Sequence, residues 1–163
     1  MQLPSVDQLK RRTTLHLRRT FFRTTLSRSV VRLIDRDKSM PLGKRGELAA
    51  ERFLLKQGYW IIDRGVGEKT GEIDLIVSDG ISIIFVEVKT RSSDFAGDPT
   101  EAVDEAKQRH ICQTARLFAV KNGLENTSMR FDVISILWPD LEKSPEISHY
   151  KSAFEAIGDF QMF

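Results

Sequence analysis

Two apolar, β-branched segments joined by an Asp-Gly turn constrain the fold of this chain more than any other feature. Residues 73–77 and 81–89 are rich in Ile, Val and Phe, and Ser78-Asp79-Gly80 lies between them. Such segments favour β-strands, and Asp-Gly is a strong signal for the turn of an antiparallel hairpin. The sequence therefore predicts two neighbouring strands that run in opposite directions.

Helical patterns lie on both sides of this hairpin. Residues 46–57 follow a helical pattern that ends at Gly58, because glycine commonly stops a helix at its C-terminal end. Residues 100–121 follow a second helical pattern that we expect to end at Asn122-Gly123. The residues expected on one side of it are Val103, Ala106, His110, Thr114, Leu117 and Phe118.

Further strands complete an α/β pattern. Residues 59–63 and 130–137 have the composition of strands, and residues 64–71 read as a loop. After Pro139 we expect a looser tail with short elements around Ile147 and Phe154. Since the connection of two strands through a helix usually makes them parallel, we expect a mixed β-sheet of about four or five strands flanked by helices.

Composition limits the class of protein. The chain has 163 residues, with 40% hydrophobic and 29% charged residues, which is ordinary for a globular domain. It has no apolar run near the roughly 20 residues that a membrane-spanning helix needs. The single cysteine, Cys112, excludes an internal disulfide, and we expect it to be a small buried side chain. A reducing compartment fits this composition, which indicates the cytoplasm.

Residues 1–39 differ in charge from the remainder of the chain. They hold ten Lys and Arg against three acidic residues, a net charge of +7, which leaves −5 for residues 40–163. We expect a disordered extension before a domain that spans residues 40–163. Four interpretations of the extension stay open: a basic arm that binds nucleic acid, an organelle transit segment, a solvated tail, or a stretch outside the natural protein that would then start at Met40.

Three charged residues interrupt the apolar hairpin. Glu87 and Lys89 point to the same side of their strand, because side chains alternate along a strand. Asp74 lies near the start of one strand, and Glu87 lies near the end of the next. An antiparallel hairpin sets these two positions side by side, so we expect Asp74, Glu87 and Lys89 to converge at one end of the sheet. The register of the two strands stays open.

This trio suits the cleavage of a phosphodiester bond. Two carboxylates offer the oxygen ligands that Mg²⁺ (or Mn²⁺) prefers, and the carbonyl of Val88 is a further candidate ligand. Lys89 would position the attacking water or counter charge on the phosphate. The structural alternative is a plain ion cluster, because a Glu-x-Lys triplet is common. For Asp132, which interrupts the strand 130–137, we expect only a role in a hydrogen-bond network.

The order of four motifs resembles the YraN-like bacterial proteins, which are predicted endonucleases of the PD-(D/E)XK superfamily. The motifs are Gly43-x-x-Gly46-Glu47-x-x-Ala50, Gly71-Glu72-Ile73-Asp74-Leu75-Ile76, Phe85-Val86-Glu87-Val88-Lys89-Thr90-Arg91 and Arg130-Phe131-Asp132-Val133-Ile134. The resemblance covers about residues 40–157. It implies a restriction-endonuclease-like fold and nucleic acid as the partner. We expect DNA, with branched DNA as one candidate form, and the choice between DNA and RNA stays open. The resemblance also implies kinship with archaeal Holliday-junction resolvases, which leaves a homodimer open.

The resemblance adds Glu47, on the first helix, to the catalytic and metal-binding residues. The alternative for Glu47 is an acid that stabilises the first turn of its helix. Candidates for phosphate contact are Lys44, Arg45, Arg91 and Lys107, and the alternative for each is a solvated surface charge.

Three function classes stay open at this point. The first is a metal-dependent endonuclease that cuts nucleic acid. The second is a nucleic-acid-binding module that does not cut, and the third is a structural or partner-binding domain with an ion cluster. The set of Asp74, Glu87 and Lys89 favours the first class, because a binding module has little need of that trio. The charge of −5 weighs against the first two classes, because proteins that bind nucleic acid are usually basic.

Overall fold

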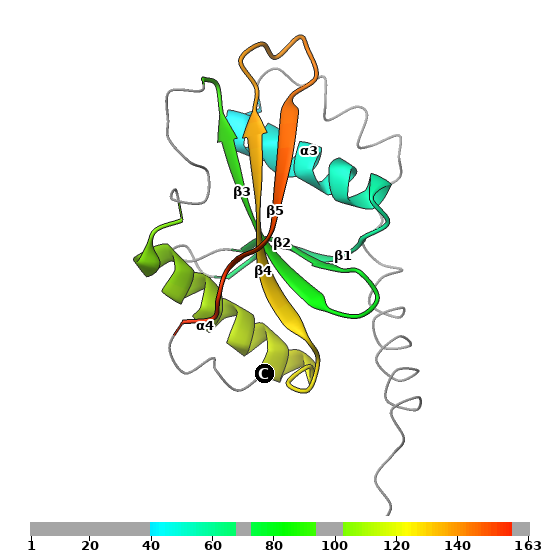
Figure 1. The fold of residues 1–163 in the computed structure, drawn as a ribbon, viewed down its shortest axis with the longest axis vertical. Helices are drawn as coiled ribbons and strands as arrows, with labels where there is room; N and C mark the ends of the chain where they lie inside the picture. Colours follow the sequence, from blue (N-terminus) through cyan, green and yellow to red (C-terminus); the bar gives the residue numbers. More distant parts are fainter. Residues whose placement is uncertain (1–39, 68–72, 94–102, 158–163) are drawn as a thin grey trace, which may run out of the picture. The chain divides into compact units, whose positions relative to one another are not determined.

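A five-stranded mixed sheet with one helix on each face forms the fold (Figure 1). The computed structural model describes residues 40–67, 73–93 and 103–157, so the predictions for residues 1–39 lie outside the described residues. The elements are α3 (Leu42–Lys56), β1 (Trp60–Val66), β2 (Ile73–Ser78), β3 (Ile83–Arg91), α4 (Glu105–Asn122), β4 (Met129–Leu137) and β5 (Glu146–Phe154). The predicted α/β class is confirmed. Neither helix of the described residues is long and apolar enough to cross a membrane.

The strands lie in the order β1-β2-β3-β4-β5. The β2–β3 pair is the predicted antiparallel hairpin, in which Ser78 pairs with Ile83 and Leu75 with Val86. In the turn, two backbone N–H groups donate to the Asp79 carboxylate, and Gly80 has a φ of 92°. The β3–α4–β4 connection makes β3 and β4 parallel, as predicted. Both β1 and β5 are antiparallel to their neighbours and form the two edges.

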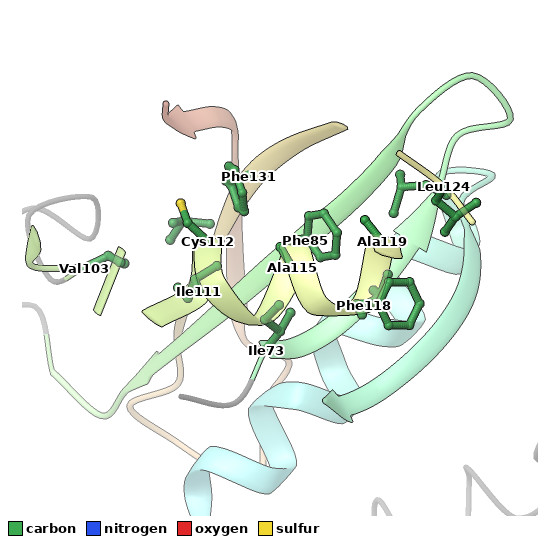
Figure 2. Close-up of a cluster of buried hydrophobic side chains, with 13 residues drawn as sticks. Ile73, Phe85, Val103, Ile111, Cys112, Ala115, Phe118, Ala119, Leu124 and Phe131 are labelled. Atoms are coloured by element: carbon green, nitrogen blue, oxygen red, sulfur yellow. The ribbon is translucent and has the colours of Figure 1, made fainter. Parts of the chain in front are cut away.

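Side-chain alternation along the strands divides the core into two layers. Alternate residues of β2, β3 and β4 face α4, and this layer includes Phe85 and Phe131, whose rings stack at a centroid distance of 5.5 Å. Figure 2 shows these two rings close to α4, in one cluster with Cys112 and Ala115 of the helix. The intervening residues form the second layer against α3, which includes Leu54. Glu87 has the same parity as Phe85, so its side chain lies on the α4 side of the sheet.

Three predicted boundaries were wrong. The first helix begins at Leu42 rather than at residue 46, so it also includes Gly43, a weak helix former that the prediction left outside. The first strand continues to Val66 through residues predicted as a loop. Arg64 in this part of the strand makes a bidentate ion pair with Glu51 of α3. The segment predicted as a looser tail is one nine-residue strand, β5, which gains its stability by pairing with β4.

The buried side of α4 also differs from the prediction. Ala106, His110 and Leu117 were expected on the buried side and are exposed, whereas Ala115 and Ala119 are fully buried. Small side chains on this side let the helix pack closely on the rings of the sheet. Cys112 is buried as predicted, and its sulfur accepts a hydrogen bond from the N–H of Ile157 at 3.4 Å. The helix ends at Gly123, which has a φ of 64°, as the predicted stop signal requires.

Candidate functional site

The hairpin opens at the end where Asp74 lies. Regular pairing of β2 with β3 runs from Ser78 to Leu75, and the same register extended by one residue would set Asp74 opposite Glu87. At this point the Asp74 side chain takes the place of a backbone acceptor, because its Oδ2 accepts from the N–H of Val88 at 2.7 Å. The structure therefore fixes the register that the sequence left open, and it brings Asp74 and Glu87 together.

Glu87 lies at the centre of the charged group. Its side chain is only 5% exposed, and two lysines pair with it: Lys89 Nζ lies 2.9 Å from Oε1, and Lys107 Nζ lies 3.2 Å from Oε2. The Lys89 contact is a hydrogen bond. The Lys107 contact is an ion pair without hydrogen-bond alignment. Glu87 Oε2 is therefore a buried oxygen that lacks a well-aligned donor. A buried carboxylate oxygen in this state is costly and is suited to accept a cation.

The electrostatics of Asp74 point the same way. Burial and then the neighbouring negative charge of Glu87 raise the pKa of Asp74 from 3.8 to about 7. The N–H of Val88 and the charge of Lys107 act against this rise, and Glu47 adds to it. The charged form of Asp74 is thus disfavoured by burial and by a neighbouring carboxylate, and a divalent cation bound there would stabilise it.

Glu47 joins the site from α3. Its charge contributes to the raised pKa of Asp74, and its Oε2 pairs with Lys44 Nζ at 2.7 Å. The alternative of a first-turn acid does not fit, because α3 starts at Leu42 and its first turn holds no acidic residue. Glu47 therefore lies in the second turn of a helix that packs on the strands of the site.

A glycine allows this close packing of α3. A Cβ atom on Gly46 would lie 1.7 Å from Oγ1 and 2.8 Å from Cβ of Thr90 on β3. Only glycine therefore fits where α3 crosses β3. Gly46 directly precedes Glu47 on α3, and Thr90 directly follows Lys89 on β3. The sequence prediction missed this role. The available signal was a helix-weakening glycine next to a predicted catalytic acid.

The four basic residues predicted to contact phosphate lie in different surroundings. Lys107 is in the site, as described above, and Arg91 is partly exposed at the end of β3. Lys44 is exposed on α3 beside Glu47. Arg45 is buried, with its guanidinium 4.9 Å from the ring centroid of Trp138 and a hydrogen bond to the carbonyl of Leu141. For Arg45 the structure contradicts the solvated alternative, because its charge packs inside the fold, and the phosphate contact stays a prediction.

The donor set fits a divalent metal at two carboxylates. Asp74 and Glu87 supply oxygen ligands, and Val88 lies between Glu87 and Lys89 with its N–H bonded to Asp74. Within residues 40–67, 73–93 and 103–157, no three His, Cys, Asp or Glu side chains form a preformed metal-binding group. Glu47 therefore stands beside the pair rather than in one compact cluster with it, and Glu72 lies outside the described residues.

A second buried carboxylate lies away from this site. Asp132 is 0% exposed and accepts hydrogen bonds from Arg130, from His149 and from the N–H of Ser152. Burial alone would raise the pKa of Asp132, but these hydrogen bonds outweigh burial and hold the pKa below its usual value. The predicted hydrogen-bond network at Asp132 is confirmed.

Sequence comparisons place the chain among known proteins. Residues 46–136, which contain Asp74, Glu87 and Lys89, match the model of the uncharacterised protein family UPF0102. A UPF0102 protein of Geotalea uraniireducens is 42% identical over 121 residues, which cover 74% of this chain and 94% of that protein. A UPF0102 protein of Symbiobacterium thermophilum is 47% identical over 98 residues, which cover 60% of this chain and 83% of that protein. A UPF0102 protein of Rhodopirellula baltica is 40% identical over 125 residues, which cover 75% of each protein. The chain described here belongs to the UPF0102 family.

Proposed function

We propose that this protein is a magnesium- or manganese-dependent endonuclease that hydrolyses phosphodiester bonds in nucleic acid. One observation carries the proposal: Asp74 and Glu87 lie together at the open end of a hairpin, where burial and mutual repulsion raise the pKa of Asp74 to about 7. A fold that needed only an ion cluster would gain nothing from this repulsion. A bound divalent cation would relieve it.

The residues divide the work as follows. Asp74 and Glu87 would hold the metal, with the carbonyl of Val88 as a further ligand and Glu47 beside them. When bound, the metal supplies polarisation of the phosphate and a lower pKa for a bound water. Lys89, which Glu87 Oε1 holds at 2.9 Å, positions the attacking water or counters the charge that develops on the phosphate.

The substrate class follows from the charge of the site and from the family resemblance. The site offers cationic contacts for a phosphate backbone from Lys89, Lys107 and the nearby Arg91. These contacts are local, because residues 40–163 as a whole carry a net negative charge. Such local contacts with phosphate bind without regard to base sequence. We therefore propose DNA as the substrate, with branched DNA as the form to test first.

The test is a cleavage assay with the full chain. Labelled single-stranded, duplex, flap and junction DNAs are incubated with Mg²⁺ or Mn²⁺, with EDTA as the blank. We expect Asp74→Asn and Lys89→Met to lower the rate by at least about a hundredfold, the size typical of one lost electrostatic group. Asp79→Asn is the matched control, because Asp79 is a partly exposed acid beyond the opposite end of β2.

The outcomes separate the function classes. Cleavage that survives Asp74→Asn and Lys89→Met would overturn the assigned site. Binding of DNA without cleavage by the wild-type protein would instead support the non-cleaving nucleic-acid-binding module. Absence of both would leave the third class, a structural domain with an ion cluster.

A further inference from the structure

Glu87 is shared by two lysines that reach it in different ways. Lys89 lies two residues away on the same strand, so strand geometry alone makes this contact. Lys107 comes from the first turn of α4, eighteen residues after Lys89. The helix cap fixes its backbone, because the Asp104 carboxylate accepts from the N–H of Lys107 at 2.8 Å. The fold thus places the ammonium group of a second lysine beside the carboxylate of Glu87.

The two contacts differ in strength. Lys89 donates a hydrogen bond to Oε1, whereas Lys107 lies 3.2 Å from Oε2 without hydrogen-bond alignment. The side chain of Lys107 is 29% exposed, so its ammonium retains access to solvent and to large ligands. A lysine ammonium on a four-carbon stem can also change partners at little cost, because it has no fixed planar geometry to satisfy.

On this basis we propose that Lys107 is a phosphate-binding residue whose resting partner is Glu87. Lys107 pairs with Glu87 Oε2 while the two carboxylates hold no cation, and it contacts a phosphate of the nucleic acid once they do. This inference rests on the proposed function, since it assigns a role within the same site.

The charges explain the exchange. Glu87 Oε2 is the carboxylate oxygen that lacks a well-aligned donor, so it is the oxygen most available to a divalent cation. A divalent cation at Oε2 repels the ammonium of Lys107, and a phosphate bound at the same site attracts it. Lys89 keeps its bond to Oε1 throughout. Lys107 therefore competes with the metal for Glu87 and cooperates with it in holding nucleic acid.

This pair of opposite effects gives the experiment. Mn²⁺ binding to the full-length protein is measured by calorimetry for the wild type, Lys107→Met and Lys121→Met. Lys121 is the matched control, because it is an exposed lysine on the same helix, about 20 Å from Lys107 at 1.5 Å per residue. We expect Lys107→Met to bind Mn²⁺ about fivefold more tightly, in keeping with the loss of one competing ion pair, and Lys121→Met to match the wild type.

Binding of a labelled duplex is then measured in Ca²⁺ and in EDTA, with a gel to show that the DNA stays intact. In Ca²⁺ we expect Lys107→Met to bind several times more weakly and to lower the slope of log affinity against log salt by about 0.9, the value for one lost phosphate contact. In EDTA the same substitution should have little effect, because Lys107 is then held by Glu87. A merely structural role would lower binding equally in both conditions.

Each result decides something. Equal or weaker Mn²⁺ binding by Lys107→Met, or an equal loss of DNA binding with and without Ca²⁺, would overturn the inference and leave the proposed endonuclease in place. Failure of the wild type to bind Mn²⁺ would overturn the proposed metal site itself. Lys107→Gln, which keeps a polar side chain, replaces Lys107→Met if circular dichroism shows that the latter does not fold.

Discussion

Asp132 and Asp74 are two aspartates of one sheet in opposite electrostatic states. Asp132 is fully buried, yet donors from Arg130, His149 and Ser152 hold its pKa below the usual value. Asp74 is less buried, but its nearest strong influences after burial are the negative charge of Glu87 and a single N–H bond, and its pKa rises to about 7. Burial is thus a poor guide to the state of a carboxylate, and the donors around it decide.

The difference separates structural from functional charge. Both carboxylate oxygens of Asp132 accept hydrogen bonds, so its negative charge is compensated within the fold. These hydrogen bonds also link β4 to β5. At Asp74 and Glu87 the fold leaves repulsion and an oxygen without a well-aligned donor. A site that stores unfavourable charge is stabilised by a ligand of opposite charge, which is the property expected of a metal site.

The largest effect should come from breaking the complete network. Asp132→Asn leaves Arg130 without its buried counter-charge and changes the carboxylate that His149 contacts. We therefore expect a loss of about 3 kcal/mol in the free energy of unfolding, the size typical of a broken buried ion pair. Urea denaturation measures it. Asp79→Asn, which removes the other and partly exposed carboxylate bound to Arg130, should cost less than about 1 kcal/mol. Similar losses in both variants would contradict the distinction drawn for Asp132.

A smaller effect of opposite sign is expected at Asp74. The pKa of its carboxyl in the folded protein, about 7, lies above the ordinary value of 3.8, so the folded state binds the proton more tightly. Its contribution to stability is therefore complete below about pH 4 and is lost as the pH rises through about 7. Asp74→Asn should remove this decline, on the order of 2 kcal/mol between about pH 4 and pH 8.

Urea titrations in EDTA at several pH values measure this change, because EDTA removes any metal that would compensate the charge. Asp79→Asn is again the control, because the pKa of Asp79 in the folded protein is lowered to about 2, so its carboxyl stays ionised in the fold throughout this window. The idea fails if the wild type and Asp74→Asn show the same pH dependence.

The sequence was sufficient for the hairpin and its acids but not for their register. Side-chain alternation and the Asp-Gly turn predict that Asp74 and Glu87 share one end of the sheet, because both signals are local. The position of Lys107 depends on how α4 returns across the sheet, which the parallel β3–β4 connection determines. Sequence could name Lys107 as a basic residue near the site, but its ion pair with Glu87 is a tertiary contact.

The errors have the same physical origin. The expected inner side of α4 included Ala106, His110 and Leu117, all of which are exposed, because helical periodicity alone does not fix which side faces the sheet. The structure instead buries Ala115 and Ala119, so that the helix can approach the phenyl rings. The start of α3 was placed too late because Gly43 is a weak helix former. In both places close packing against the sheet overrides local preference.

Effects of similar or smaller size should distinguish the two glycines of α3. Gly46→Ala places its Cβ atom 1.7 Å from Thr90 Oγ1, so α3 must move away from β3, and we expect a loss of about 1–3 kcal/mol in the free energy of unfolding. Gly43→Ala meets nothing within 4 Å, so it should gain about 0.5–1 kcal/mol from helix propensity alone. Thermal and urea denaturation measure both, and a loss in both variants would mean that helix packing is not what requires Gly46.

The same pair tests whether the packing of α3 serves the site as well as the fold. Because Glu47 directly follows Gly46, a displaced helix moves one negative charge away from Asp74, whereas Gly43→Ala leaves it in place. We expect Gly46→Ala to weaken Mn²⁺ binding by a few fold, about the effect of one partly screened charge, and Gly43→Ala to leave it unchanged. Replacing Thr90 by Gly removes all three contacting atoms, so it should restore both stability and Mn²⁺ affinity to Gly46→Ala if the clash is the cause. Restored stability without restored affinity would show that Glu47 is supported by the fold but does not contribute to the metal site.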